Sequence, residues 1–274
     1  MRIVPMALGF GAEVSGFDIH NGRDPDDVAL LHAALDAYDL LVFRNCGSIS
    51  PDRHMEIGGW FGPLEAQRGP HGEGWSRIGN DSDSGDNVPL FHSDMTMLEH
   101  PVEALSLHVL ELPHGRTTTT FASSVVGWAR LRRDLKQRAG DLRVRHCFHG
   151  GEFPDLGWPD LFQYHPIRKT HPRTGKDLLF VSQFHADKIE GMDDAEAREL
   201  LERLFDCLYA PDCLYEHVWR DGDLIIWDNL AVQHARTTAP VSGERRVLQR
   251  VAVGAHSMHD QIEQVRARQA QVEA

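Results

Sequence analysis

Two histidine–aspartate pairs of equal spacing occur among the 17 histidines of the chain. His92 and Asp94 lie in FHSDMT, and His185 and Asp187 lie in FHADK. Side chains two residues apart on an extended strand point to the same face, so either pair could offer an imidazole and a carboxylate to one metal ion. Two histidines and one carboxylate leave three positions open on one face of Fe(II), as in non-haem iron oxygenases. Such a site requires a further histidine from elsewhere in the chain.

A candidate for that histidine, and two candidate anion-binding arginines, lie in residues 222–253. In this segment an apolar strand carries WDN, His234 follows on the connection, and a further strand contains Arg246 and Arg250. Their even spacing places both guanidinium groups on one strand face. A buried arginine needs an anion, because an unpaired buried cation is very costly. The anion is either the carboxylate of a bound small molecule or an Asp or Glu of a neighbouring strand, and the residues alone leave both open.

Composition restricts the class of protein. With 274 residues, 41% hydrophobic and 25% charged, the chain is typical of a soluble globular protein, and no repeat or long linker divides it. We therefore expect one domain over residues 1–274, with a polar, helix-prone C-terminal tail at residues 260–274. The formal net charge of −13 argues against nucleic acid and acidic membranes as partners. The four cysteines lack CxxC spacing, which predicts neither a zinc knuckle nor a disulfide framework.

The N-terminus has no charged start followed by a long apolar run, and no apolar stretch is long enough to span a membrane. A cytoplasmic location is therefore expected. The oligomeric state stays open, because a long amphipathic helix predicted at residues 193–210 suits a homo-oligomer contact as well as it suits covering a sheet.

Short strands dominate the predicted elements after residue 88. The alternation of Leu105, Leu107 and Val109 predicts a strand with one apolar face. Further strands are predicted at residues 40–44, 117–121, 142–148, 177–182, 213–219, 223–228 and 245–253, and helices after residue 26, from residue 51, and at residues 125–140. The DGD turn at residues 221–223 is predicted to join two of these strands as a hairpin. Many strands with few helices favour a mainly β sandwich or barrel with flanking helices.

The motifs HSD, TTTTFAS, HPRTG, FHADKIEGM, WDNLAVQH and RRVLQR occur in an order that resembles the taurine dioxygenase family, which also contains the chlorophenoxyacetate dioxygenases. The resemblance runs from about residue 40 to residue 254. It implies a double-stranded β-helix, or jelly roll. It also implies an Fe(II)- and 2-oxoglutarate-dependent dioxygenase, which uses O2 to oxidise, most simply by hydroxylation, a C–H bond of a small organic substrate with release of succinate and CO2.

The resemblance assigns roles to the candidate residues. It implies that His92, Asp94 and His234 form the catalytic Fe(II) site. It also implies that Thr119 and Arg246 hold the far carboxylate of 2-oxoglutarate. The pair of His185 and Asp187 matches a segment that leads into the long helix, so the resemblance gives it a structural or surface role.

For the primary substrate, the resemblance matches Arg250 and His71 to residues that contact an anionic group. Phe91 and Val88 stand where taurine dioxygenase has a tryptophan and an asparagine, which argues against taurine itself as the substrate. The glycine-rich segment Gly69 to Gly85 is long, polar and poor in anchoring apolar residues, which makes it a candidate for a lid, although the sequence leaves open whether it is one.

Two other functions use the same residues. A zinc-dependent hydrolase could be built on the same three ligands, although the sequence offers no evident general base and no use for paired arginines. A non-catalytic module that binds a small anion is the second alternative. Dependence of turnover on the identity of the metal, on O2 and on 2-oxoglutarate distinguishes the three.

Overall fold

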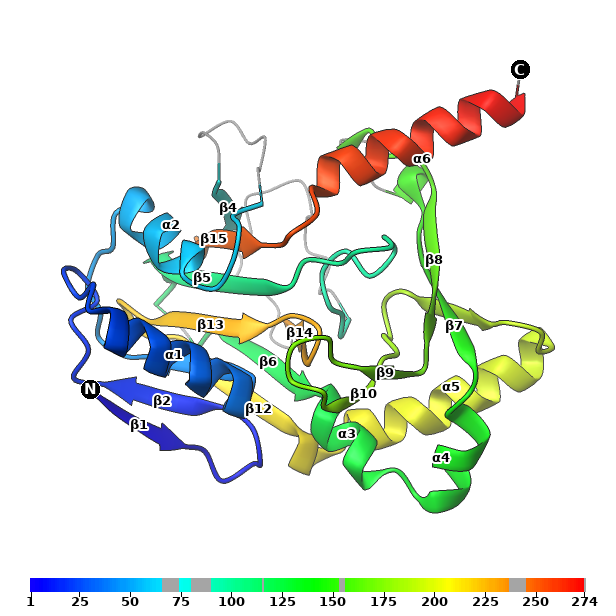
Figure 1. The fold of residues 1–274 in the computed structure, drawn as a ribbon, viewed down its shortest axis with the longest axis horizontal. Helices are drawn as coiled ribbons and strands as arrows, with labels where there is room; N and C mark the ends of the chain where they lie inside the picture. The colour runs from blue at the N-terminus through cyan, green and yellow to red at the C-terminus, as the bar shows by residue number, and fades with distance from the viewer. Residues whose placement is uncertain (66–73, 80–89, 115, 153–155, 237–244, 274) are drawn as a thin grey trace.

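Two β-sheets form the centre of the molecule (Figure 1). The computed structural model describes residues 1–65, 74–79, 90–114, 116–152, 156–236 and 245–273. The larger sheet contains, in spatial order, β1 (Arg2–Pro5), β2 (Ala12–Ser15), β3 (Leu40–Phe43), β13 (Leu224–Asp228), β5 (Ala104–Glu111), β15 (Val247–Val253) and β4 (Ser76–Gly79). The smaller sheet contains β12 (Leu214–Val218), β6 (Thr118–Ser123) and β14 (Val232–Ala235). All pairings in these sheets are antiparallel except β2 with β3.

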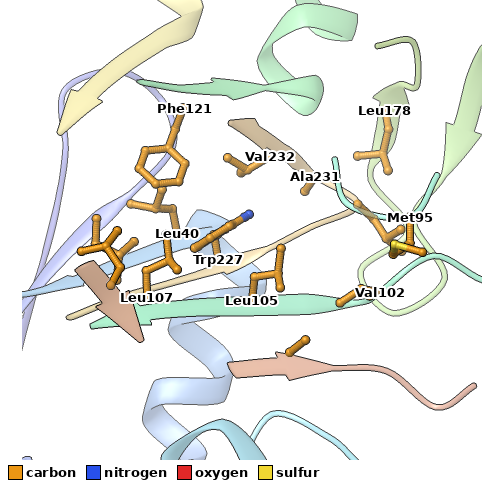
Figure 2. Packing of buried hydrophobic residues seen from close by; sticks show 14 of the residues in the cluster. Leu40, Met95, Val102, Leu105, Leu107, Phe121, Leu178, Trp227, Ala231 and Val232 are labelled. Atoms are coloured by element: carbon orange, nitrogen blue, oxygen red, sulfur yellow. The ribbon is translucent and has the colours of Figure 1, made fainter. Parts of the chain in front are cut away.

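The main hydrophobic core lies between these sheets. Leu105, Leu107 and Val109 of β5 all face it, which confirms the alternation predicted for this strand. Figure 2 shows the Trp227 ring of β13 in the middle of the cluster, with Phe121 of β6 on one side and β5 on the other. The Trp227 and Phe121 rings meet edge to face at 5.3 Å. The two-layered arrangement is a jelly roll, as the resemblance implies.

Two helices cover the outer face of the larger sheet: α1 (Pro25–Tyr38) and α2 (Pro51–Gly59). Ser50 caps α2, because its hydroxyl accepts a hydrogen bond from the Arg53 N–H, and Pro51 occupies the first turn as predicted. Apolar residues of both helices form a second core with the sheet: Leu31, Leu35, Ile57, Leu41, Phe43 and Ile226. The helices therefore cover only the outer face of the sheet, and its inner face is available for the candidate functional site described below.

A third layer packs beside the smaller sheet. Its strands are β7 (Arg143–Phe148), β8 (Leu161–Pro166), β9 (Arg168–Thr170), β10 (Asp177–Leu179) and β11 (Ala186–Ile189), and its helices are α3 (Ser124–Arg130), α4 (Arg133–Ala139) and α5 (Asp194–Leu208). Val144 and Ile167 pack with Leu200 and Leu204 of α5. The single helix predicted at residues 125–140 is two helices, because the backbone is extended at Leu131.

The predicted hairpin at the DGD turn is wrong. The turn separates β12 from β13, but these strands lie in different sheets, β12 beside β6 and β13 between β3 and β5. Asp223, which is completely buried, accepts hydrogen bonds from the Arg44 guanidinium, the His217 ring and the Arg220 N–H. This network fixes the turn as a corner between the sheets.

The helix-prone tail forms α6 (Met258–Glu273), which projects from the body (Figure 1). Ile262 is buried at its base, while Arg266 and Gln269 donate hydrogen bonds to the carbonyl oxygens of Gly157 and Asp160. Within the described ranges, no helix combines the length and apolar character that a membrane crossing requires.

Candidate metal and co-substrate site

Backbone pairing brings His92 and His234 together. They form an antiparallel bridge in which each N–H donates to the carbonyl oxygen of the other, at 3.1 and 2.8 Å. Residues directly opposite each other in such a bridge project to the same side, and the two ring centroids are 4.4 Å apart. His234 lies on β14, which is held in turn by β6.

Asp94 completes the group from a turn and not from the extended strand that the spacing suggested. Met95 adopts a left-handed conformation (φ 64°), which bends the chain directly after Asp94. The Asp94 Oδ1 atom lies 3.5 Å from His92 Nε2 and 3.7 Å from His234 Nε2. All three ligand atoms fall within 4.8 Å of one another, and no other such triad occurs in the part of the chain that is described.

The orientation of the His92 ring and the low pKa of His234 suit a divalent cation. The His92 Nδ1 atom lies 2.8 Å from the carbonyl oxygen of Leu90, which only accepts, so Nδ1 is the donor in this bond and Nε2 is the nitrogen that faces the other two residues. Burial lowers the pKa of His234 to about 3, and electrostatic repulsion from the nearby His92 is the second contribution. Two imidazoles beside a carboxylate are a fitting donor set for Fe(II).

Arg250 sets the charge state and orientation of Asp94. Its Nη2 atom lies 2.5 Å from Asp94 Oδ2, so Oδ1 is the oxygen that faces the two histidines. Burial alone would raise the pKa of Asp94. The Arg250 charge and the hydrogen bond with His92 outweigh burial, and they hold this pKa well below its usual range. Asp94 is therefore ionised at neutral pH.

Asn229, which the sequence reasoning did not single out, holds the backbone of Asp94. Its side-chain Oδ1 accepts the Asp94 N–H at 2.9 Å, and its Nδ2 donates to the carbonyl oxygens of Asp94 at 3.0 Å and Val102 at 2.7 Å. Asn229 is fully buried. Its position in WDN was the available signal, but its partner lies far away in the sequence.

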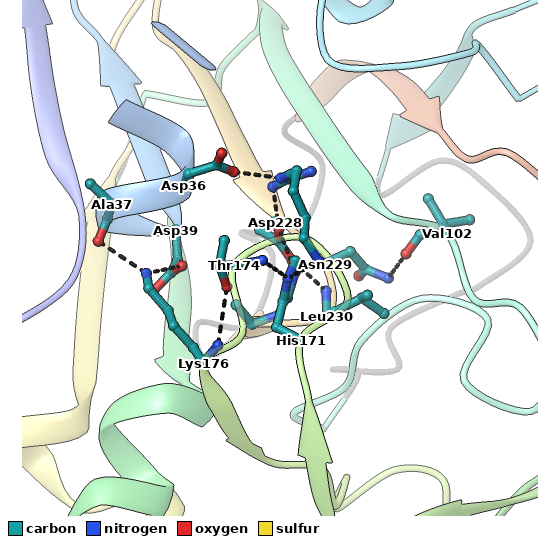
Figure 3. A network of polar contacts seen from close by, with 12 residues as sticks. Asp36, Ala37, Asp39, Val102, His171, Thr174, Lys176, Asp228, Asn229 and Leu230 are labelled. Atoms are coloured by element: carbon teal, nitrogen blue, oxygen red, sulfur yellow. Dashed lines mark hydrogen bonds and ion pairs between the residues drawn. The ribbon is translucent and has the colours of Figure 1, made fainter. Parts of the chain in front are cut away.

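The neighbouring Asp228 holds the turn that carries the chain toward His234. Its Oδ1 accepts the N–H groups of Leu230 and Ala231 at 3.0 and 3.1 Å. Its Oδ2 is bound by His171 Nε2 at 2.9 Å and by Arg173 at 2.8 Å, and Figure 3 shows this network around Asp228. Both polar residues of WDN thus support the candidate triad of His92, Asp94 and His234 without belonging to it.

The structure also places Thr119 beside Arg246 in the interior. The Thr119 hydroxyl oxygen accepts hydrogen bonds from Arg246 Nη2 at 3.2 Å and from Trp219 Nε1 at 2.9 Å. Burial, with Arg236 nearby, lowers the pKa of Arg246 to about 10, so the guanidinium remains charged at neutral pH. A buried cation next to a hydroxyl suits a carboxylate. The sequence did not predict Trp219 as a member of this cluster.

The second histidine–aspartate pair diverges. His185 is buried, with its ring 6.0 Å from that of His92, whereas Asp187 forms an ion pair with Arg145 nearer the surface. The register of β11 against β7 shifts between Ala186 and Lys188, so Asp187 lies in a bulge and loses the alternation that equal spacing would give.

The remaining predictions concern His71, Val88 and the candidate lid. His71 and Val88 lie outside the described residues. Within the expected lid Gly69 to Gly85, Ser76–Gly79 form β4, which pairs with β15 at the edge of the larger sheet, so this part is a strand and not a loop. The other residues of that segment, except 74 and 75, are outside the described ranges.

Comparisons with known proteins identify the family of this chain. The family model described as taurine catabolism dioxygenase TauD, TfdA family, matches residues 2–252. An (S)-phenoxypropionate/alpha-ketoglutarate-dioxygenase of Sphingobium herbicidovorans is 29% identical over 267 residues, which cover 89% of this chain and 91% of the relative. A pentalenolactone F synthase of Streptomyces arenae is 25% identical over 283 residues, covering 92% and 94%.

The fold is likewise that of a solved taurine dioxygenase from Burkholderia xenovorans, with a TM-score of 0.81 at 24% identity and coverage of 93% of this chain and 91% of that one. Because the family model spans nearly the whole chain, this protein belongs to the TauD, TfdA family of dioxygenases.

Proposed function

We propose that the chain is an Fe(II)- and 2-oxoglutarate-dependent dioxygenase that hydroxylates a C–H bond of a small anionic substrate. Family membership supports the dioxygenase class, and the relative named as an alpha-ketoglutarate-dioxygenase supports the co-substrate. The observation that carries the proposal is the convergence of His92, Asp94 and His234 on one point. The buried pair of Thr119 and Arg246 supplies a second, separate carboxylate site.

Each group has a defined task. The Nε2 atoms of His92 and His234 and the Oδ1 atom of Asp94 would hold Fe(II). Arg246 and Thr119 bind the far carboxylate of 2-oxoglutarate, which orients its oxo-acid end toward the metal. Fe(II), when bound, supplies the reduction of O2 coupled to oxidative decarboxylation. One oxygen atom enters succinate as CO2 leaves, and the other enters the hydroxylated product, so the reaction is balanced.

Arg250 and the aromatic residues near His92 favour a small organic acid as the substrate. Arg250 contacts Asp94 through one nitrogen, and its remaining N–H groups can donate to an anionic group beside the metal. Phe91, which stacks on Tyr209 at 4.4 Å, and the partly exposed Phe184, whose ring lies 5.6 Å from that of His92, offer apolar surface for the carbon skeleton. His71 is proposed as a second anion contact.

The same proposal includes one catalytic domain over residues 1–274, a cytoplasmic location, and either a monomer or a homo-oligomer, without nucleic acid as a partner. The net charge of −13 supports the last point. The zinc hydrolase and the non-catalytic module are not favoured, because neither explains why an iron-type triad and a buried carboxylate site occur together in a chain of this family.

An anaerobic visible absorption spectrum tests the proposal without knowledge of the substrate. Purified protein receives Fe(II) and then 2-oxoglutarate, with His92→Ala as the test variant and the exposed His100→Ala as the matched control. A weak metal-to-ligand charge-transfer band should require both additions, persist in His100→Ala and vanish in His92→Ala. If metal binds and no band forms in the unaltered protein, the oxygenase assignment fails and the two alternatives take its place.

A further inference from the structure

The hydroxyl of Thr119 has an unusually restricted environment. Trp219 Nε1 and Arg246 Nη2, at 2.9 and 3.2 Å from its oxygen, carry hydrogen and cannot accept. The oxygen therefore accepts twice and uses both lone pairs. A threonine hydroxyl has one hydrogen, and here that hydrogen must point away from both donors.

That hydrogen needs an acceptor, because Thr119 is only 3% exposed. Among the described residues, the two hydrogen bonds of the Thr119 hydroxyl, with Trp219 and Arg246, are both ones that its oxygen accepts. A carboxylate oxygen placed against the Arg246 guanidinium would supply the acceptor, because carboxylates accept only. A ligand group that only donates would leave the hydroxyl hydrogen unsatisfied.

Trp219 is rigidly placed for this contact. It lies directly after β12, where its N–H donates to the Thr117 carbonyl oxygen at 3.1 Å, so its ring is the diagonal neighbour of Thr119 across the strand pair. The His217 ring packs against it edge to face at 4.6 Å. The Arg246 guanidinium carbon lies 6.0 Å from the Trp219 ring. The indole N–H thus has little freedom to move away from Thr119.

We propose that Trp219 is a positioning residue for the co-substrate. Its N–H orients the Thr119 hydroxyl so that the hydrogen meets the far carboxylate of a 2-oxo dicarboxylic acid, which favours a far end that accepts hydrogen bonds over one that has no acceptor. This inference rests on the proposed function, in which Thr119 and Arg246 form the far-carboxylate site.

Binding of 2-oxoglutarate to Mn(II)-loaded protein, measured by calorimetry, tests the inference without turnover. Trp219→Phe keeps an aromatic ring and removes the N–H, so the dissociation constant should rise about three- to tenfold, the value of one hydrogen bond. Pyruvate, a 2-oxo acid that lacks the far carboxylate, should bind the variant and the unaltered protein equally. Trp128→Phe, which changes a buried tryptophan in the separate core around α5, should affect neither ligand.

A double-variant cycle adds a second criterion. Thr119→Val removes the hydroxyl, so Trp219→Phe should cause no further loss of 2-oxoglutarate affinity in that background. A general packing defect would instead add to the loss of 2-oxoglutarate affinity in the double variant, and it would weaken the binding of pyruvate as well. The inference is overturned if Trp219→Phe weakens the binding of 2-oxoglutarate and of pyruvate equally. It is also overturned if Trp219→Phe leaves 2-oxoglutarate binding unchanged while Thr119→Val weakens it.

The proposed function fails in a different way. If neither Thr119→Val nor Arg246→Ala weakens the binding of 2-oxoglutarate, the assignment of the far-carboxylate site is wrong.

A second measurement leaves Trp219 unaltered and therefore does not depend on whether the Trp219→Phe variant folds. The indole N–H resonance of Trp219 in Zn(II)-loaded protein should move on addition of 2-oxoglutarate and stay in place with pyruvate, and equal shifts with both ligands would contradict the inference.

Discussion

Asn229 links the proposed metal ligand Asp94 to the core, and its replacement by alanine gives the sharpest test of how the site is built. The side chain makes three hydrogen bonds of 2.7 to 3.0 Å, two to the backbone of Asp94 and one to Val102. The Val102 bond is visible in Figure 3. Asn229→Ala leaves one N–H and two carbonyl groups without this partner.

The expected cost follows from those three groups. Each buried polar group left unsatisfied costs about 1 to 3 kcal/mol. Asp94 lies at a partly open rim, with its side chain 16% exposed, so water can reach its backbone more readily than that of the buried Val102. We therefore expect a loss of about 3 kcal/mol in the free energy of unfolding, near the low end of the sum. Metal affinity should fall about 10- to 100-fold, as for other outer-shell partners of metal ligands.

Urea unfolding of the metal-free protein and calorimetric titration with Mn(II) measure the two effects separately. Asn229→Asp is the informative companion, because it keeps an acceptor for the Asp94 N–H but sets a carboxylate against two carbonyl oxygens, so it should bind metal no better than Asn229→Ala. The exposed Asn21→Ala is the control. Metal affinity within twofold of the unaltered protein, in a variant that is less stable, would refute the positioning role and leave Asn229 with a purely structural one.

Other predictions address single groups. Asp94→Ala should abolish Fe(II)-dependent turnover while the far-UV circular dichroism stays unchanged, and normal turnover would remove Asp94 from the metal site. Arg246→Ala should raise the 2-oxoglutarate requirement about tenfold or more, because a charge-assisted hydrogen bond is worth about 1.5 to 3 kcal/mol, whereas an unchanged requirement would make it a structural ion-pair residue. Arg250→Gln should raise the pKa of Asp94 and therefore shift the acid limb of Mn(II) binding to higher pH, which titrations at several pH values would detect. Burial, and to a smaller extent the charge of nearby His108, lowers the pKa of His54 from 6.5 to about 3. As the pH falls, His54 therefore takes up its proton in the unfolded chain before it does so in the folded protein. His54 alone should then lower the unfolding free energy by about 1.4 kcal/mol per pH unit as the pH falls from 6.5 toward the folded value, and His54→Gln should reduce the pH dependence in urea unfolding by that share.

Local patterns predicted the elements whose burial follows their own periodicity. Leu105, Leu107 and Val109 face the core as their alternation required, and Ser50 begins a helix because its hydroxyl can cap one in any context. The DGD turn shows the limit of such patterns. Its sequence suits a hairpin, but the choice of partner strand depends on which sheet buries each apolar face, and Asp223 binds groups from other elements.

Equal spacing likewise did not distinguish the two histidine–aspartate pairs. His92 meets His234 through a backbone bridge, whereas Asp187 is turned away by a bulge, and both features depend on pairing with distant segments. The family resemblance supplied what spacing could not. Neither source pointed to Asn229 or Trp219, because their hydrogen bonds exist only after separate parts of the chain have met.

Strand β6 connects the proposed metal ligands to the cluster of Thr119, Trp219 and Arg246 that is proposed to bind a carboxylate. Thr119 and Phe121 lie on the same face of this strand, two residues apart. On one side His234 is paired opposite Phe121, and on the other side the end of β12 brings Trp219 beside Thr119. A shift of one residue in either pairing would turn the functional side chain to the opposite face. The buried Phe121, packed against Trp227, opposes such a shift. A core residue that belongs to neither group therefore helps to fix the geometry between the proposed metal ligands and the cluster around Thr119.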